Sequence, residues 1–269
     1  LGYEITVGVE STGNTRHFKR LVNSKDIFVK VTNTMKFKIV NESVSKTDKR
    51  DAKTIAEFVQ KDILPEAILC SDKSEQLRRI TNSRKVLVGT RVKLKNQIHG
   101  ILMGMGITTK SGQFNSKVGR KNIVKLVEKT SNARIVEILI NNIENIEESI
   151  KEIEKEMEKL TEDDRVVKIL NSIPGTGLIS AVTVRAHIDD ITRFDSYKKL
   201  SGFVGLAPWV QCSDEKRYYG SITKRGPEPC RTALVQMVLG MIRCKEEKTN
   251  IFMIQYRSEE RRVGKECAT

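Results

Sequence analysis

The sequence has few of the residues that mark several common protein classes. Its 269 residues include five cysteines, one tryptophan and only 5% aromatic residues in total. No two cysteines form a CxxC pair, which disfavours a zinc ribbon and a disulfide-stabilised scaffold. The longest apolar run, near 233–242, is too short to span a bilayer, and no N-terminal stretch resembles a signal peptide. These absences predict a reduced intracellular protein with no membrane segment.

Acidic residues are outnumbered, and they are unevenly distributed. The chain holds 48 Lys and Arg against 34 Asp and Glu, a formal net charge of +14. This excess favours a polyanionic partner, with nucleic acid first. Residues 144–164 nevertheless contain ten acids and three lysines, whereas residues 76–105 contain seven bases and no acid. The location of the charge therefore matters more than its total.

Both charged segments show helical periodicity. In the acidic one, apolar spacings of three and four alternate over about three heptads, which is typical of a coiled coil. These positions are Val136, Leu139, Ile143, Ile146, Ile150, Ile153, Met157 and Leu160. The basic segment has a similar frame, with Arg84 and Arg91 in two of its seam positions. Two interpretations stay open: the two helices neutralise each other as an antiparallel pair, or the basic helix also follows a phosphate backbone.

The remaining segments predict a mixed architecture. Strand-like residues 1–9 and 26–31, with a helix through Leu21 and Val22 between them and another helix at 47–60, indicate part of an α/β sheet. After residue 172 the chain turns to short helices and loops that contain Gly and Pro. We expect an α/β domain over 1–75, long helices and a coiled coil over 76–164, and a mostly helical domain over 165–256.

Both ends of the chain are unusual. The sequence has no initiator Met and begins on the approach to a strand, so we expect the first strands of the α/β domain to be missing. Residues 257–267 read RSEERRVGKEC, which resembles the translation of a sequencing-library adaptor. We therefore treat 257–269 as an adaptor-derived tail and exclude it from the fold.

Three acids near the N-terminus are candidate metal ligands. Glu10 ends the first predicted strand, and Asp48 and Asp51 lie three apart on a predicted helix. That spacing places both carboxylates on one helical face. Carboxylates of this kind suit Mg²⁺, and paired ions of that type support phosphodiester chemistry. The alternative is a solvated helix of mixed charge, because several lysines and arginines flank the two aspartates.

Two further segments could act on nucleic acid. The sequence IPGTG at 173–177 resembles the hairpin of helix-hairpin-helix modules, in which glycine amides contact a phosphate; a plain turn is equally compatible. Ser213 lies in a predicted turn, with Lys224 and Arg225 close in sequence. Taken alone, it is an ordinary turn serine. No histidine is nearby, which disfavours triad chemistry.

Taken in order, several motifs resemble one known family. They are VGVESTGN, KTDKRDAKTIAEF, LKNQIHGIL, SIPGTGLISA, RFDSYKKLSGFVGLAPWV and GSITKRGP. Together they are similar to DEDD-type transposases of the insertion-sequence one-ten family, from residue 7 to about 243. The resemblance implies an incomplete ribonuclease-H-like (RuvC-type) domain, long coiled-coil helices, and a mainly helical C-terminal transposase domain with a helix-hairpin-helix-like motif.

The resemblance also implies roles for individual residues. Glu10 matches the second acid of the DEDD set, and Asp48 and Asp51 match the third and fourth, which bind Mg²⁺. Ser213 matches the serine that attacks DNA and becomes covalently linked to it. The family usually has Gly after this serine, whereas this chain has Asp214. The first acid of the set is absent here, so we expect this fragment to be inactive.

The family also implies partners and a setting. Its members are DNA recombinases of bacteria and archaea, and we expect a cytoplasmic homo-oligomer that binds DNA and a structured guide RNA. Nucleic-acid contacts are predicted at Arg78, Arg79, Arg84, Lys85, Lys95, Gly175, Gly177, Lys224 and Arg225. Two alternatives remain: a non-catalytic nucleic-acid-binding or assembly protein, and a metal-dependent nuclease that does not need Ser213.

Overall fold

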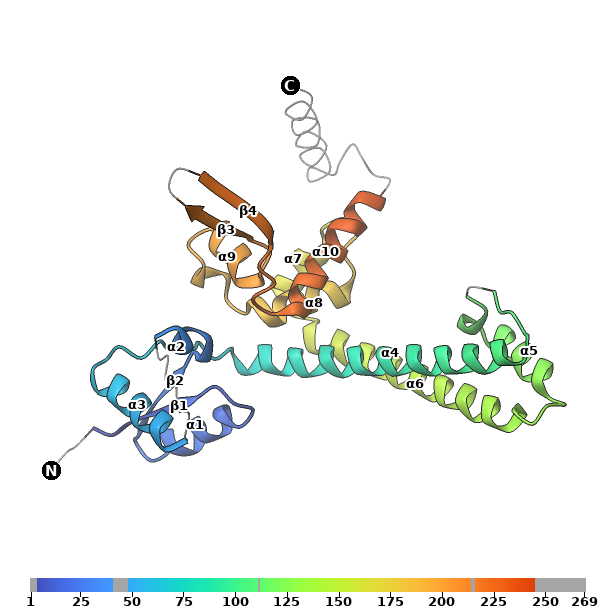
Figure 1. The fold of residues 1–269 in the computed structure, drawn as a ribbon, viewed down its shortest axis with the longest axis horizontal. Coiled ribbons are helices and arrows are strands. Elements are labelled where there is room, and N and C mark those ends of the chain that lie inside the picture. Colours follow the sequence, from blue (N-terminus) through green and yellow to red (C-terminus); the bar gives the residue numbers. More distant parts are fainter. Residues whose placement is uncertain (1–3, 41–47, 111, 214–215, 245–269) are drawn as a thin grey trace, which may run out of the picture. The chain divides into compact units, whose positions relative to one another are not determined.

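The fold was analysed in a computed structural model that describes residues 4–40, 48–110, 112–213 and 216–244. The chain divides into two compact units, residues 1–70 and 71–269 (Figure 1). The helices on both sides of Arg165, where the sequence suggested a domain boundary, belong to the same unit. Within the described ranges, no helix is both long and apolar enough to cross a membrane.

The first unit combines a pair of strands with three helices. Strands β1 (Thr6–Glu10) and β2 (Phe28–Thr32) are parallel, with Glu10 opposite Thr32. They alternate with α1 (Thr15–Asn23), α2 (Thr34–Val40) and α3 (Asp48–Gln60). The predicted order of strands and helices is thus present, although α2 was not predicted. The described sheet of this unit has two strands, so the ribonuclease-H-like architecture stays a prediction.

A connecting segment covers one edge of β2. The amide of Asn33 donates to the carbonyl of Pro65, and the amide of Ala67 donates to that of Val31, both at 2.7 Å. Lys30 on β2 forms ion pairs with Asp62 and Glu66 in the same segment. Beneath it lies a small apolar core of Phe37, Ile55 and Leu64. Backbone hydrogen bonds from this segment therefore cover the edge of β2.

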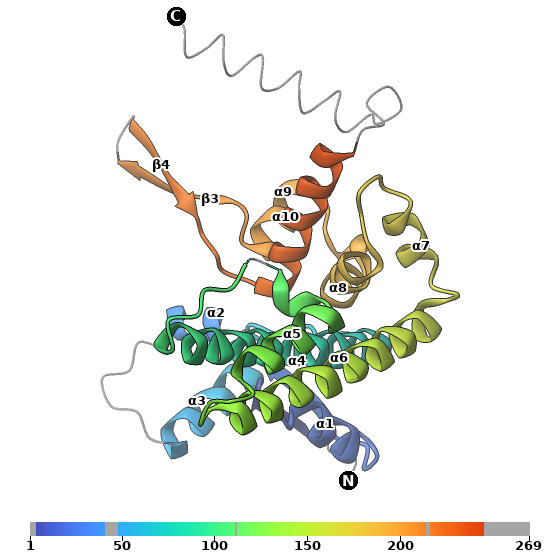
Figure 2. The same cartoon turned by 90° about the vertical axis from the view of Figure 1, so that its right-hand side faces the viewer.

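Two long helices organise the second unit. Helices α4 (Asp72–Gly104) and α6 (Ala133–Thr161) lie side by side in Figures 1 and 2. Arg84 Nε lies 2.7 Å from Glu154 Oε1, and Arg91 Nη1 lies 3.8 Å from Glu147 Oε1. Ion pairs in this order require antiparallel helices. The interpretation that the two helices neutralise each other is therefore confirmed for these pairs.

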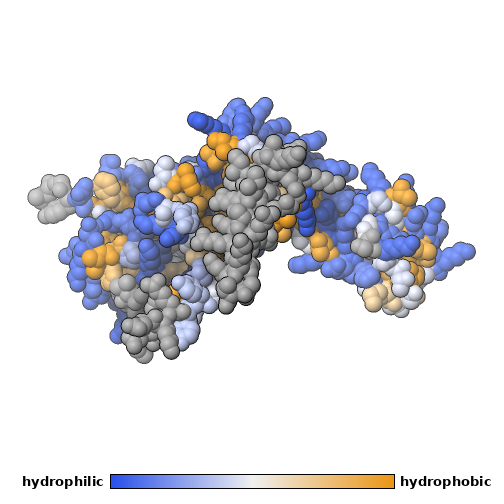
Figure 3. All heavy atoms as spheres, turned by 90° about the horizontal axis from the view of Figure 1, so that it is seen from above, coloured by the Kyte–Doolittle hydropathy of each residue, from blue (hydrophilic) through white to orange (hydrophobic). Residues whose placement is uncertain are grey.

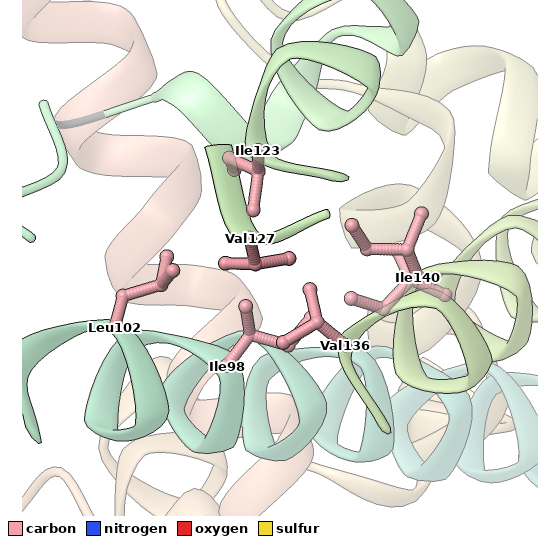
Figure 4. Close-up of a cluster of buried hydrophobic side chains, with 7 residues drawn as sticks. Ile98, Leu102, Ile123, Val127, Val136 and Ile140 are labelled. Atoms are coloured by element: carbon pink, nitrogen blue, oxygen red, sulfur yellow. The ribbon is translucent and has the colours of Figure 1, made fainter. Parts of the chain in front are cut away.

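The apolar periodicity of α6 matches its burial. Val136, Ile143, Ile150 and Met157, spaced by seven, are each at most 5% exposed. The far end of the pair is closed by η1 (Gln113–Asn115) and α5 (Lys117–Val127), which the sequence analysis did not predict. Figure 4 shows how Ile123 and Val127 of α5 meet residues of α4 and α6. The buried set is Ile98, Leu102, Ile123, Val127, Val136, Ile140 and Ile143.

The C-terminal part packs helices around α8. Its elements are α7 (Arg165–Asn171), α8 (Leu178–Ile188), η2 (Ile191–Arg193), α9 (Tyr197–Val204), β3 (Pro208–Ser213), β4 (Lys216–Ile222) and α10 (Glu228–Arg243). Helix α8 contacts both α4 and α10. Six of its eleven residues are buried, as expected for a helix that is apolar on most sides. The predicted tail at 257–269 lies outside the described residues.

One prediction about this region is wrong. The sequence analysis gave only helices and loops here, whereas β3 and β4 form an antiparallel hairpin that extends from α9 and α10 (Figures 1 and 2). Its strand propensity comes from the consecutive aromatic residues Tyr218 and Tyr219 and from Trp209 and Val210. Gly220 and the polar residues after Cys212 interrupt that signal. The visible face of the space-filling view is mostly hydrophilic, with small separate hydrophobic clusters (Figure 3).

Candidate active site

A glycine lets α3 approach β1 closely. A Cβ atom at Gly8 would lie 2.5 Å from Ile55 Cγ2 and 2.7 Å from Val59 Cγ2. Both neighbours are β-branched, so neither side chain can move away easily. With hydrogen at position 8, Ile55 packs against the strand and is 5% exposed. This contact sets the position of the whole of α3, including its first turn.

The three predicted acids line one cavity. Glu10 stands at the carboxyl end of β1, while Asp48 and Asp51 occupy the first turn of α3. All three border a cavity of about 480 Å³. Acidic residues in the first turn of a helix are favoured by its dipole. The structure thus brings together residues that are about 40 positions apart in the sequence, on the two elements that Gly8 joins.

A threonine that the sequence analysis missed shapes the rim of this cavity. Thr15 is 4% exposed, and its hydroxyl donates to the carbonyl of Glu10 at 2.8 Å. The same hydroxyl accepts a hydrogen bond from the amide of Thr12 at 2.7 Å. Both threonines also line the cavity, together with Asn14. The turn that follows Glu10 is therefore held by one buried hydroxyl. The only sequence signal for it was a cluster of small polar residues.

The donor atoms of the cavity suit a hard cation. The residues that line it are Gly8, Val9, Glu10, Thr12, Asn14, Thr15, Phe18, Asp48, Asp51, Ala52 and Ile55. This lining contains carboxylate, hydroxyl and amide oxygens and no lysine or arginine. Among the described residues, no group of three His, Cys, Asp or Glu is close enough to hold a metal ion together. Mg²⁺ usually binds only one or two protein carboxylates and keeps several waters. The residues of this cavity therefore suit a Mg²⁺ ion whose remaining ligands are water.

Ser213 is the last residue of β3 and not simply a turn residue. Its backbone pairs with that of Lys216 across the hairpin, and Cys212 pairs with Arg217. Asp214, which stands where the family usually has glycine, lies outside the described residues. The structure thus places position 213 at the tip of an extended hairpin. That hairpin belongs to the second unit, whereas the acidic cavity belongs to the first.

The loop with Lys224 and Arg225 has a fixed backbone. Lys224 has a positive φ of 53°, and its amide donates to the carbonyl of Gly205 at 3.1 Å. A Cβ at Gly205 would lie 2.4 Å from the carbonyl oxygen of Arg225. Only glycine permits that approach at the positive φ of 77° found there. Both basic residues are exposed, so this loop presents two cations from a rigid support.

The predicted contacts of the basic helix all have partners within the protein. Arg78 Nε donates to the carbonyl of Ala186 at 2.8 Å, and Arg84 pairs with Glu154. Arg79 and Lys85 form exposed ion pairs with Glu75 and Glu228, and Lys95 donates to Asn115 Oδ1 at 2.8 Å. Burial, together with the charge of Arg91, lowers the pKa of Lys95. Arg78 and Arg84 therefore hold helices together, whereas the exposed pairs can exchange for phosphate at little cost.

The IPGTG hairpin lies between α7 and α8 and packs against α10. A Cβ at Gly175 would lie 2.3 Å from the carbonyl carbon of Gly240, and one at Gly240 would lie 2.1 Å from the oxygen of Gly175. The two backbones thus touch directly. Gly177, by contrast, faces open space. Of the two glycines predicted to contact phosphate, Gly175 has a packing role, and the position of Gly177 leaves room for a ligand.

A polar network, also missed by the sequence analysis, joins α4 to α7 and α8. Burial alone would raise the pKa of Asp189, but hydrogen bonds from Ser71, Ser74 and Arg185 outweigh it and lower that pKa to about 2. Arg185 Nε also lies 3.3 Å from Asp164, which accepts two amides at the start of α7. Ser71 and Ser74 precede the other three residues by 90 to 118 positions, so no local motif indicates the network.

Two family models of known proteins match the chain. A family model described as "Transposase IS116/IS110/IS902 family" matches residues 167–252. A DEDD transposase model named for IS110 matches residues 2–107. The first match contains the hairpin and Ser213, and the second contains the three acids. Together the two matches include every residue of the candidate site.

Curated relatives are also similar over most of the chain. The transposase for insertion sequence element IS1111A of Coxiella burnetii is 27% identical over 91% of this chain. The "Probable family 20 transposase" of Pseudomonas aeruginosa is 24% identical over 76%, and the transposase for IS1328 of Yersinia enterocolitica is 26% identical over 71%. The matches span 68%, 62% and 58% of the lengths of these relatives.

Proposed function

We propose that this chain is a member of the IS110/IS116 family of DEDD transposases, as its two family-model matches support, and that it carries the catalytic groups of a DNA transposase that cuts and rejoins strands. The observation that carries this proposal is the common cavity of Glu10, Asp48 and Asp51. A solvated helix of mixed charge would not require the acids of a helix and of a strand end to border one space. The alternative of a non-catalytic binding protein gives that cavity no role.

One or two of the three acids would hold Mg²⁺ beside the scissile phosphate, with water completing its coordination. Glu10, Asp48 and Asp51 supply hard oxygen donors, and Thr12 and Asn14 add neutral ones at the rim. A bound Mg²⁺ offsets negative charge on the phosphate and on the leaving oxygen. The chain's own contribution is to fix these donors: Gly8 sets the position of α3, and Thr15 sets the turn after Glu10.

Ser213 would act as the nucleophile. In the proposed step its oxygen forms a bond to phosphorus, the bond from phosphorus to one deoxyribose oxygen breaks, the serine loses its proton and the leaving oxygen gains one. The negative charge of the transferring phosphate requires nearby cations, and the rigid loop with Lys224 and Arg225 follows the same hairpin. A covalent intermediate conserves the energy of the broken bond for rejoining.

An active centre of this composition draws on both units of the chain. The acids lie in residues 1–70 and the serine in residues 71–269, and we propose that they meet on DNA, within a homo-oligomer. A structured guide RNA is part of the same proposal. It rests on the family resemblance, and the net charge of +14 is compatible with a polyanionic partner.

Metal binding tests the role of the acids. Binding of Mn²⁺, as a paramagnetic substitute for Mg²⁺, can be titrated by electron paramagnetic resonance. We expect Asp48→Asn combined with Asp51→Asn to weaken binding by about tenfold or more, because two carboxylates are lost. Glu57→Gln is the matched control, since Glu57 lies on the same helix but does not line the cavity. Equal affinity in the double variant and the control would remove the metal site from the proposal.

A further inference from the structure

The hairpin carries three exposed aromatic residues, among them the only tryptophan of the sequence. The sequence has one tryptophan and five tyrosines. That tryptophan, Trp209, and two of the tyrosines, Tyr218 and Tyr219, lie within the fifteen residues from Pro208 to Ile222. They are 52%, 56% and 67% exposed, respectively. Exposed aromatic side chains that gather on one element can form a patch that binds a partner, whereas single exposed ones are ordinary.

The strand register assigns these residues to two faces. Gln211 is paired with Tyr218, and Val210 with Tyr219. Because paired residues share a face and successive side chains alternate, Gln211 and Tyr218 lie on one face, and Val210 and Tyr219 on the other. The pairing is irregular at Trp209, but its ring lies against position 220, which alternates onto the face of Tyr218. The first face therefore leads along β3 from Trp209 to the tip that carries Ser213.

A glycine keeps the indole of Trp209 against the hairpin. A Cβ at Gly220 would lie 3.0 Å from Cε3 of Trp209 and 3.6 Å from its carbonyl oxygen. The indole thus lies over the bare backbone of β4, next to the irregularity in the pairing between Pro208 and Val210. An aromatic ring supported from below by backbone keeps its other face available. Such a ring can accept a base by stacking without a change in the hairpin.

The charge around the hairpin favours a polyanion over an apolar partner. In the sequence, residues 208–225 contain four basic residues and only two acidic ones. The basic residues are Lys216, Arg217, Lys224 and Arg225, and the acidic ones are Asp214 and Glu215. Exposed aromatic rings combined with an excess of basic residues are the usual composition of surfaces that bind single strands, because bases stack on the rings and phosphates pair with the cations. Paired bases in a duplex offer no free π-face to such a surface.

We propose that Trp209 and Tyr218 form a stacking platform for unpaired bases of the DNA strand that Ser213 attacks. The platform would hold one or two nucleotides beside the scissile phosphate and so orient the strand. Trp209 and Tyr218 are positioning residues in this account and take no part in bond making. The identity of the bound strand rests on the proposed function, but the stacking itself does not.

The unique tryptophan supplies the experiment. Fluorescence of the 269-residue chain reports Trp209 alone, since there is no second tryptophan. We expect oligothymidylate of twelve nucleotides, added in the presence of a metal chelator, to quench this fluorescence, and a DNA duplex of the same length to leave it unchanged. Tyr218→Leu should weaken the binding of the oligonucleotide by about tenfold. Tyr219→Leu, on the opposite face, should bind as the unaltered protein does.

The Trp209→Leu variant is tested with a labelled oligonucleotide, because it has lost the intrinsic probe. Its fluorescence anisotropy titration should show a loss similar to that of Tyr218→Leu, with circular dichroism unchanged in all three variants. Equal losses in Tyr218→Leu and Tyr219→Leu would overturn the platform. So would tighter binding of oligouridylate than of oligothymidylate, which would assign the surface to RNA. If sedimentation showed a smaller assembly for Trp209→Leu and Tyr218→Leu while oligonucleotide binding was unchanged, the aromatic surface would be assigned to contact with a second copy of the protein.

Failure of this inference is distinguishable from failure of the proposed function. The titration needs neither metal nor strand cleavage. Suppose that single strands quench the fluorescence but that the protein expressed from the genomic reading frame forms no covalent adduct with DNA. That result would support the platform and overturn the transposase role. Adducts at Ser213 combined with unquenched fluorescence would do the reverse.

Discussion

At the scale of the residue, the smallest side chain has the largest effect on the acidic cavity. Gly8 has no functional group, yet it sets the distance between the strand that ends at Glu10 and the helix that begins at Asp48. The sequence showed this glycine within the motif VGVESTGN. It could not show that Ile55 and Val59 would lie against it, because that contact depends on how α3 packs.

Gly8→Ala tests this contact. The added methyl overlaps two β-branched side chains, so α3 must move away from β1, and we expect a loss of about 1–3 kcal/mol in the free energy of unfolding. Urea denaturation measures it. Gly13→Ala is the control, because a Cβ at Gly13 meets nothing within 4 Å. Two variants of equal stability would show that the close approach is not needed.

His187 gives the protein a predictable response to acid. The side chain is 8% exposed, and burial together with the positive charge of Arg78 lowers its pKa from 6.5 to about 4. The unfolded chain therefore binds a proton at a pH where the folded protein does not. Stability is unaffected by this group above pH 6.5 and falls as the pH decreases from 6.5 to about 4, by up to about 3 kcal/mol.

The measurement is the free energy of unfolding across that range, in the protein and in His187→Gln. We expect the free energy of unfolding of the variant to fall less between pH 6.5 and 4, because the contribution of His187 is absent. The decline associated with Asp189, whose pKa is lowered from 3.8 to about 2, should remain below pH 4. His17→Gln, at an exposed position, serves as the control. Parallel curves for His187→Gln and the unaltered protein would contradict this account.

At the scale of the element, the sequence predicted what is periodic and missed what is not. Strand β2 and helices α3, α4 and α6 follow from alternation, heptads and charge, and all four are present. Helix α5 and the hairpin of β3 and β4 were missed. The first is short and preceded by a glycine-rich link, and the second is interrupted by Gly220 and by polar residues. Their stability comes from packing and pairing rather than from local pattern.

The ion pair between α4 and α6 can be measured by a double-mutant cycle of Arg84→Gln and Glu154→Gln. The two side chains are 23% and 34% exposed and their atoms lie 2.7 Å apart, so we expect a coupling energy of about 1 kcal/mol. The exposed pair of Arg134 and Glu137, within one helix, should give about 0.3 kcal/mol. Equal coupling in both pairs would mean that the interhelical pair contributes nothing beyond a surface contact.

At the scale of the whole molecule, the candidate site is distributed over two units. The spacing of Glu10, Asp48 and Asp51 predicts a metal site, the family resemblance predicts the role of Ser213, and the structure brings the three acids to one cavity. The serine ends a hairpin in the other unit. The joint action of the two groups on DNA is therefore part of the proposed function, and neither local sequence patterns nor the fold of a single unit contains it.

The most direct test of this account is to locate the covalent bond between protein and DNA. Protein from the genomic reading frame that encodes this chain is incubated with labelled element ends and Mg²⁺, digested, and mapped by mass spectrometry. The account predicts a nucleotide on Ser213, absent from Ser213→Ala and from Asp48→Asn with Asp51→Asn, and retained in Ser221→Ala on the neighbouring strand. An adduct that persists in Ser213→Ala, or strand exchange without any adduct, would contradict it.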